Sequence, residues 1–178
     1  EQGEIEKSKY IDVEKGILSK GITGKTAEGI KYHAYKVRGD EEAKNLFEFL
    51  AKNTEVEWSW IQLGKSGSSG LNYLTTSHEK EREQGAVEMF MKQFFYGYTV
   101  RAHIHSHPSN TSKPSGFGKN PGDIQFARWV VSHLKYQPVF KIYLPKYSMY
   151  IQYNPNLKKS DFEQPSYELP EIIIKPKK

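Results

Sequence analysis

The chain has 178 residues, a net charge of +5 and no cysteine. This length fits one ordinary domain with a tail, because domains most often hold about 100–150 residues. The missing thiols exclude disulfides, cysteine-ligated zinc and cysteine nucleophiles. The lysines are scattered, which gives a nucleic-acid partner little support. No apolar run approaches the roughly 20 residues of a membrane span, and the start lacks a signal peptide's apolar stretch. We therefore expect a soluble chain.

The first half of the chain predicts a strand, a helix and a second strand. Residues 1–39 are rich in glycine and polar residues, and we expect an N-terminal extension or edge strands, with a strand at 31–37. Residues 40–53 carry apolar residues at helical spacing, and Asp40 is the candidate N-cap of this helix. Residues 55–64 are rich in β-type residues and run into a loop of glycine and serine.

The second half predicts two further helices and a closing hairpin. Thr76 and Glu79 fit a capping box, followed by a helix with one apolar side formed by Val87, Phe90, Met91, Phe94 and Phe95. A strand at 98–107 and a helix starting at Asp123 follow, and this helix directs Ile124, Ala127, Val131 and Leu134 inward.

The hairpin joins residues 139–144 to 148–153. Alternating strands and helices predict an α/β domain over residues 40–153, with a mixed sheet between helices. Residues 154–178 lose periodicity and gain prolines, so we expect an extended C-terminal tail.

The segment "HIHSHP" places histidines at positions 103, 105 and 107. Residues i and i+2 of a strand share a face and lie about 6.6 Å apart, so His105 and His107 can bind one zinc ion. His103 lies about 13 Å from His107 and is expected to support the site or the fold instead. Asp123 is the candidate third ligand, because a strand–loop–helix unit can bring the helix start beside the strand end. Taken alone, an aspartate such as Asp123 before a helix is more often an N-cap than a metal ligand.

The string "HSHP", a loop and "PGD" together resemble the motif of the JAMM, or JAB/MPN-type, zinc metalloproteases. In that family a glutamate precedes the first histidine by about 45–55 residues and lies seven residues before a glycine. Glu57 lies 48 residues before His105 and seven before Gly64. The resemblance implies a JAB/MPN-like, cytidine-deaminase-like α-β-α sandwich. It also implies that His105, His107 and Asp123 bind zinc while Glu57 acts as the catalytic base.

Two departures from the family motif concern the loop. Residues 108–122 are fifteen, against about ten in the family, and Asn120 replaces the serine that stabilises the oxyanion. An Asn120 amide N–H could replace that donor, as could Ser109, Ser112 or Ser115. We expect this loop to form one wall of the cleft and to be mobile without substrate.

The whole pattern looks most like the JAB-like toxin domains of bacterial Rhs and other polymorphic toxins. This implies a zinc-dependent peptidase or isopeptidase with a protein or peptide substrate, an immunity protein as a further partner, and a cytoplasmic or delivered location. The alternative is a catalytically inactive JAB/MPN-like binding module, which the Asn120 substitution favours and the intact ligand set opposes. Zinc-dependent base deamination needs a cysteine pair that this chain lacks.

Overall fold

The computed structural model describes residues 11–118 and 121–162. The strands are β1 (Ile22–Lys25), β2 (Lys31–Arg38), β3 (Ser59–Leu63), β4 (Leu71–Thr76), β5 (Val100–Ser106), β6 (Val139–Leu144) and β7 (Met149–Tyr153). The helices are α1 (Asp40–Asn53), α2 (Gly85–Tyr96) and α3 (Asp123–Leu134). Short 3-10 turns are formed by η1 (Gly67–Ser69), η2 (Pro145–Tyr147) and η3 (Lys159–Phe162).

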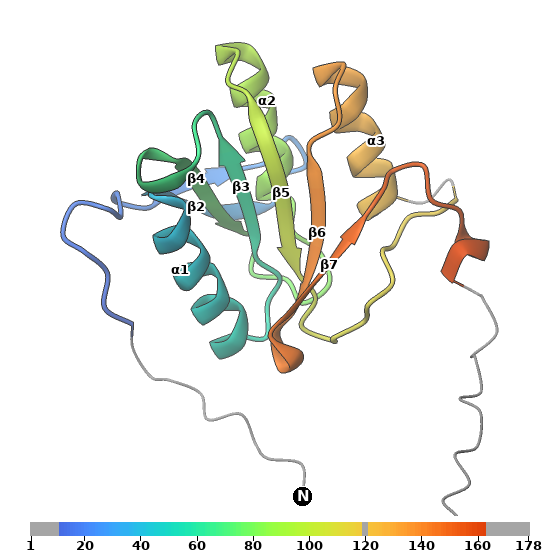
Figure 1. Ribbon diagram of the computed structural model, residues 1–178, viewed down its shortest axis with the longest axis horizontal. Helices are drawn as coiled ribbons and strands as arrows, with labels where there is room; N and C mark the ends of the chain where they lie inside the picture. Colours follow the sequence, from blue (N-terminus) through green and yellow to red (C-terminus); the bar gives the residue numbers. More distant parts are fainter. Residues whose placement is uncertain (1–10, 119–120, 163–178) are drawn as a thin grey trace, which may run out of the picture.

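The strands of this described part form one mixed sheet between two helical layers (Figure 1). Their order is β1-β2-β4-β3-β5-β6-β7, and β5 and β6 are the parallel pair, joined through α3. α1 packs on one face of the sheet, and α2 and α3 pack on the other. The expected α/β class with a mixed sheet flanked by helices is therefore confirmed.

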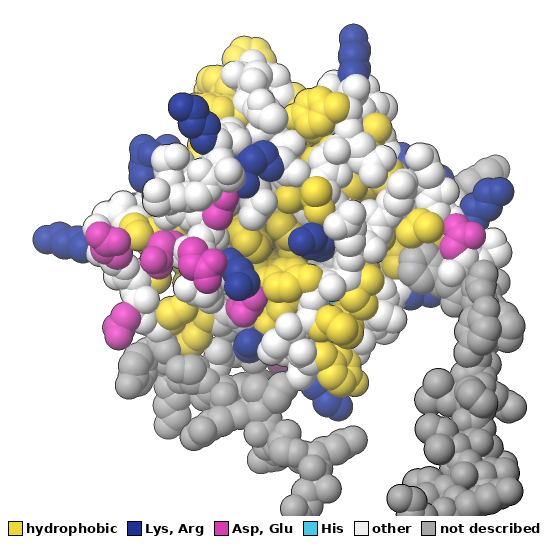
Figure 2. Space-filling model, viewed as in Figure 1, with side chains coloured by type: hydrophobic (Ala, Val, Ile, Leu, Met, Phe, Trp, Pro, Cys, Tyr) yellow, Lys and Arg dark blue, Asp and Glu magenta, His cyan; other side chains and the backbone are white. Residues whose placement is uncertain are grey.

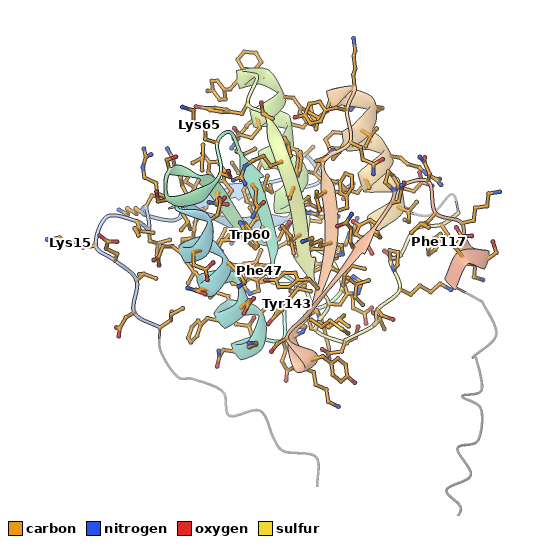
Figure 3. All side chains as sticks on the ribbon, in the orientation of Figure 1. Lys15, Phe47, Trp60, Lys65, Phe117 and Tyr143 are labelled. Carbon is orange, nitrogen blue, oxygen red and sulfur yellow. The ribbon has the colours of Figure 1, made fainter. Side chains whose placement is uncertain are left out.

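The alternation of side chains in β3 and β5 separates the two cores. Trp60 and Ile104 face α1, where Phe47 packs 5.7 Å from Trp60 and 5.6 Å from Tyr143 between ring centroids. Figure 3 shows these three aromatic rings gathered where α1 meets the sheet. Ile61 and its alternate neighbours face α2 and α3. The polar side chains on this second face of the sheet therefore lie beneath α2 and α3.

The segment between the second predicted strand and α2 differs from expectation. Residues 71–76 form β4, a central strand that the sequence pattern did not indicate, and α2 begins only at Gly85. The Thr76/Glu79 capping box is therefore wrong. The Thr76 hydroxyl instead donates to the Glu57 carbonyl oxygen at 2.8 Å, which ties β4 to the residue before β3.

The orientation of α2 also corrects the predicted apolar side. Its buried face consists of Ala86, Met89, Phe90 and Gln93, whereas Val87, Met91 and Phe95 face solvent. Helical spacing alone does not choose between two apolar stripes on the same helix.

The carboxylate of Asp40 does not cap α1, whose N-cap is Gly39. It accepts two hydrogen bonds from Arg101 on β5, at 2.7 and 3.0 Å, and one from the Gly67 amide at 2.9 Å. The Asn72 amide donates a further bond at 3.2 Å. Burial works to raise the pKa of Asp40, but these donors, with Arg101 foremost, outweigh it and leave the pKa below its ordinary value of 3.8.

We predict that Asp40→Asn lowers the free energy of unfolding by about 1–3 kcal/mol at pH 7, because the Arg101 guanidinium loses its charged partner. A depressed pKa in the folded state stabilises the fold above pH 4, and this contribution is lost as the pH falls through the folded pKa. The difference in free energy of unfolding between Asp40→Asn and the parent should therefore shrink below pH 4, as measured by urea titration. Glu41→Gln is the control, since Glu41 is exposed and pairs with Lys44 at 3.8 Å, and it should change stability little. An equal, pH-independent loss in both variants would contradict the assignment.

Candidate metal centre and its cleft

Three side chains from two elements converge at the end of β5. The Nε2 atoms of His105 and His107 lie 3.0 Å apart. Asp123 at the start of α3 places Oδ1 3.0 Å from His105 Nε2 and Oδ2 3.5 Å from His107 Nε2. The structure thus brings the three predicted ligands together, with one donor atom from each within 4.8 Å of the others.

These separations fit a small tetrahedral cation. Ligands bound at 2.0–2.1 Å in tetrahedral geometry lie about 3.3 Å from one another, close to the three observed distances. Two imidazoles and one carboxylate form a donor set typical of zinc, and three protein ligands leave one position for water or substrate. The group is therefore suited to a catalytic rather than a structural ion.

Backbone and hydroxyl groups of the 107–122 loop hold two of the ligands. His107 Nδ1 donates to the Thr111 carbonyl at 2.7 Å, which leaves the Nε2 lone pair free for a cation. The Ser115 amide and hydroxyl donate to Asp123 Oδ2 at 2.7 and 3.0 Å. Asp123 is therefore the first residue of α3 and does not serve as its cap, which is Gly122.

The electrostatics of Asp123 follow from its neighbours. Burial works to raise its pKa, but the adjacent imidazoles of His105 and His107 outweigh burial and hold the pKa below its ordinary value. The carboxylate is thus ionised at neutral pH, as a ligand must be.

Glu57 lies just before β3 and faces the same side of the sheet as His105. Its amide donates to the Glu79 carbonyl at 2.8 Å, and its carbonyl accepts the Thr76 hydroxyl. The side chain is 8% exposed. Burial raises its pKa well above the ordinary value, and the carboxylates of Asp123 and Glu83 raise it further. A carboxyl group with a raised pKa holds its proton more readily than an exposed glutamate does.

Glu83 is a second acid in the cleft, and the sequence analysis missed it. Its carboxylate accepts the amides of Gly85 and Ala86 at 2.6 and 2.9 Å, which stabilises the start of α2. Burial raises its pKa to about 7, against the lowering effect of these amides. Glu83 directly precedes Gln84, the N-cap of α2, and the misplaced start of this helix concealed its role.

His103 lies beneath the ligands rather than among them. Its Nε2 hydrogen-bonds Ser59 Oγ at 2.5 Å, and its ring stacks on His105 with centroids 5.6 Å apart. Phe126 packs against its other side at 4.8 Å. Burial lowers its pKa well below the ordinary value, as does the neighbouring His105. The expectation that His103 supports the site remains a prediction.

A cavity of about 750 Å³ opens over the three ligands and Glu57. One wall is the segment between β4 and α2, including Lys80, Glu81, Arg82, Glu83 and Gln84. The expected loop forms the opposite wall with Pro108, Ser109, Thr111, Lys113 and Ser115, while Ala86, Val87, Phe126 and Trp129 supply an apolar side. The mobility of the loop stays a prediction.

The four candidate oxyanion donors have different outcomes, and Ser112 is exposed and does not line the cavity. Asn120 lies outside the described residues. Ser115 is engaged with Asp123, since its hydroxyl donates to Oδ2 and accepts the Asp123 amide at 3.1 Å. Ser109 lines the cavity and approaches the Thr111 hydroxyl at 3.3 Å.

Comparison with known proteins identifies the family. The family model described as JAB-like toxin 1 matches residues 35–128, which include Glu57, His105, His107 and Asp123. No curated protein matches the chain significantly. The match spans more than half of the chain, and the chain therefore belongs to the JAB-like toxin 1 family. The resemblance inferred from the motif is thereby confirmed.

We predict that the parent protein binds one zinc ion per chain and that His105→Ala/His107→Ala does not, because two of three donors are removed. Metal analysis after dialysis against dilute zinc measures the stoichiometry. His133→Ala is the matched control, since His133 is exposed at the end of α3 and lies outside the cleft. Stoichiometric zinc in the double variant would refute the ligand assignment.

We also predict that Gly122→Ala weakens zinc binding by about 10–100-fold, the effect of disturbing a ligand's hydrogen-bonding partner. An added Cβ would lie 2.5 Å from Ser115 Oγ and 2.6 Å from the Gly116 amide nitrogen, so Ser115 must move away from Asp123. Competition with a chromophoric chelator measures the affinity. Gly118→Ala, where a Cβ meets no atom within 4 Å, should bind zinc as the parent does. Equal affinities in the two variants would contradict this role of Ser115.

Proposed function

We propose that this domain is a zinc-dependent metallopeptidase or isopeptidase and the toxic part of a bacterial polymorphic toxin. The observation that carries the proposal is the convergence of two imidazoles and two carboxylates on one cavity. Asp123 joins His105 and His107 as a candidate metal donor, whereas Glu57 does not belong to this group of three. Membership of the JAB-like toxin family supports the same reading. Zinc, when bound, supplies a Lewis acid that lowers the pKa of a coordinated water from about 16 to about 7.

In this proposal Glu57 moves the proton. Its carboxylate accepts a proton from the attacking water and passes it to the leaving amine, a contribution typically worth about 10²–10⁴-fold in rate. The raised pKa of Glu57 agrees with this role, because burial makes the carboxylate a stronger proton acceptor. Asp123 stays ionised beside it, so the two carboxylates divide the roles of ligand and base.

The loop supplies the remaining functions. The oxyanion that forms on the scissile carbonyl needs a donor, and we assign this role to Asn120, with Ser109 as the second candidate. The other wall, Glu81 to Gln84, orients the substrate chain across the cavity. A protein or peptide substrate suits a cleft of this size, and an immunity protein is the partner that a toxin domain requires in its producer. Among the described helices, none is long and apolar enough to cross a membrane.

We predict that Glu57→Gln keeps the fold and zinc content but lowers peptide-bond hydrolysis by at least about 10²-fold. The amide has the same shape and can still hydrogen-bond water, but it cannot accept a proton. The measurement compares single-turnover cleavage with zinc stoichiometry and the melting temperature. Cleavage within a few-fold of the parent would remove Glu57 as the base. Loss of zinc would make it a ligand instead.

The reaction class is tested with the zinc-loaded parent. A proteome-derived peptide library and a set of isopeptide-linked lysine substrates should be cleaved, and a chelator should stop the reaction until zinc is restored. Glu79→Gln is the matched control, because Glu79 lies outside the cavity lining and contacts Glu57 through its backbone carbonyl. Its rate should equal that of the parent. Full zinc occupancy without cleavage of any bond would support the inactive binding module.

A further inference from the structure

The C-terminal end of α2 exposes a cluster of large hydrophobic side chains. Phe95 is 86% exposed and Tyr96 70%, and the members we call the α2 aromatic surface are Met91, Phe95, Tyr96, Tyr98 and Tyr136. Figure 2 shows apolar side chains gathered at the top of the molecule, where α2 ends. Large exposed apolar clusters on a folded domain mark interaction sites more often than chance.

The members of the cluster come from the C-terminal end of α2 and from the segments that follow α2 and α3. Phe95 and Tyr96 pack edge to face with ring centroids 5.6 Å apart. The Tyr98 amide donates to the Gln93 carbonyl at 3.3 Å, which folds the segment after α2 back against the helix. The Tyr136 hydroxyl, beyond the end of α3, accepts the Val100 amide at 2.8 Å. These bonds fix the cluster at the end where α2, α3 and β5 meet.

The core of the domain does not require these side chains. α2 buries Met89 and Phe90 on its opposite face, and Met91 and Phe95 continue a stripe that begins at Val87 on the outward face. A stripe of residues at i, i+4 and i+8 is the pattern of a helix that packs on both sides. One side of α2 therefore lacks its packing partner within the described part of the domain.

Lysines lie around the α2 aromatic surface, α2 also carries Glu88 one turn before Met91, and the Lys92 ammonium donates to the Tyr32 hydroxyl at 3.3 Å. Lys92 is exposed on α2, and Lys135 is exposed at the end of α3. Lys65 lies in the turn after β3, and the Gly64 amide of this turn donates to the Thr99 carbonyl beside Tyr98. Figure 3 shows Lys65 pointing outward from that turn. A second copy of this chain would bring like charges together, on a molecule whose net charge is already +5.

We propose that the α2 aromatic surface with its rim of Lys65, Lys92 and Lys135 is the docking site of an acidic protein partner. The partner presents apolar side chains to Phe95 and Tyr96 and carboxylates to the lysines. Aromatic anchors surrounded by polar residues are the usual composition of a binding hot spot. Complementary charge speeds the association and excludes basic partners.

The position of this surface connects it to the cleft. Val87 belongs both to the outward stripe of α2 and to the cavity lining, and it lies about 12 Å along the helix from Phe95. An interface of ordinary size, about 800 Å² on each partner, has a radius of about 16 Å and would reach the cavity mouth. A partner docked here would restrict the entry of substrate, and this consequence rests on the proposed peptidase function. The docking itself does not rest on that function.

The test uses the full chain and a synthetic 20-residue amphipathic helix with leucine and phenylalanine on one face and glutamate on the other. A lysine version and a scrambled version are the probe controls. Fluorescence anisotropy at 50 and 300 mM salt measures binding, and amide hydrogen exchange locates it. We expect binding of the glutamate probe alone, weaker at high salt, with protection of residues 91–98.

Two variants decide whether the binding belongs to this surface. Each of two double variants should lower the affinity for the glutamate probe at least tenfold and leave zinc binding unchanged. These variants are Phe95→Ser/Tyr96→Ser and Lys65→Glu/Lys135→Glu. Tyr147→Ser/Met149→Ser, which removes exposed side chains near β7, should bind as the parent does. Equal binding in all variants, or none in the parent, overturns the proposal. Preferential binding to phosphatidylserine vesicles, or dimerisation that Phe95→Ser abolishes, also overturns it, because each assigns the surface to a different occupant.

Discussion

The register between β3 and β5 is the constraint on which the site depends. Ser59 pairs with His105 in this antiparallel ladder, and just beyond it the Ser106 amide donates to the Trp58 carbonyl oxygen at 2.8 Å. The Ser106 hydroxyl accepts the Trp58 amide as well, at 3.0 Å, so the middle residue of His-Ser-His fixes the pairing. A slip by one residue would turn Glu57 and both histidines to opposite faces of the sheet. The short polar motif thus carries the alignment as well as two of the ligands.

Burial then separates the roles of the two carboxylates. Glu57 and Asp123 face the same cavity, and each disfavours ionisation of the other. Asp123 has two imidazoles and the Ser115 donors to stabilise its charge, whereas Glu57 has acidic neighbours and little access to water. One group therefore remains ionised and the other is poised to exchange a proton. Pairs of carboxyl groups whose environments shift their pKa values in opposite directions are typical of acid–base sites.

Local patterns predicted most elements and the three candidate ligands, because His105 lies in a regular strand, His107 directly follows it and Asp123 starts a helix. The sequence did not predict β4, whose residues Asn72 and Thr75 are polar yet fully buried by hydrogen bonds and neighbouring strands. Nor did it choose the buried face of α2, since Val87 and Phe90 both belong to plausible apolar stripes. Glu83 and the Asp40–Arg101 pair were missed for a related reason. Arg101 lies 61 residues from Asp40 in the chain. The partners of Glu83 depend on where α2 begins.

The long loop between the ligands can vary in length without disturbing the ion site, because it is attached at both ends. Thr111 holds His107 at the first end, and Ser115 holds Asp123 at the second. Gly116 lies close to Gly122, and beyond this contact Phe117 packs on the core and the Gln125 side-chain amide donates to the Gly118 carbonyl oxygen. Ser115 therefore belongs to the part of the loop that the candidate metal site requires, because its amide and hydroxyl both hold Asp123.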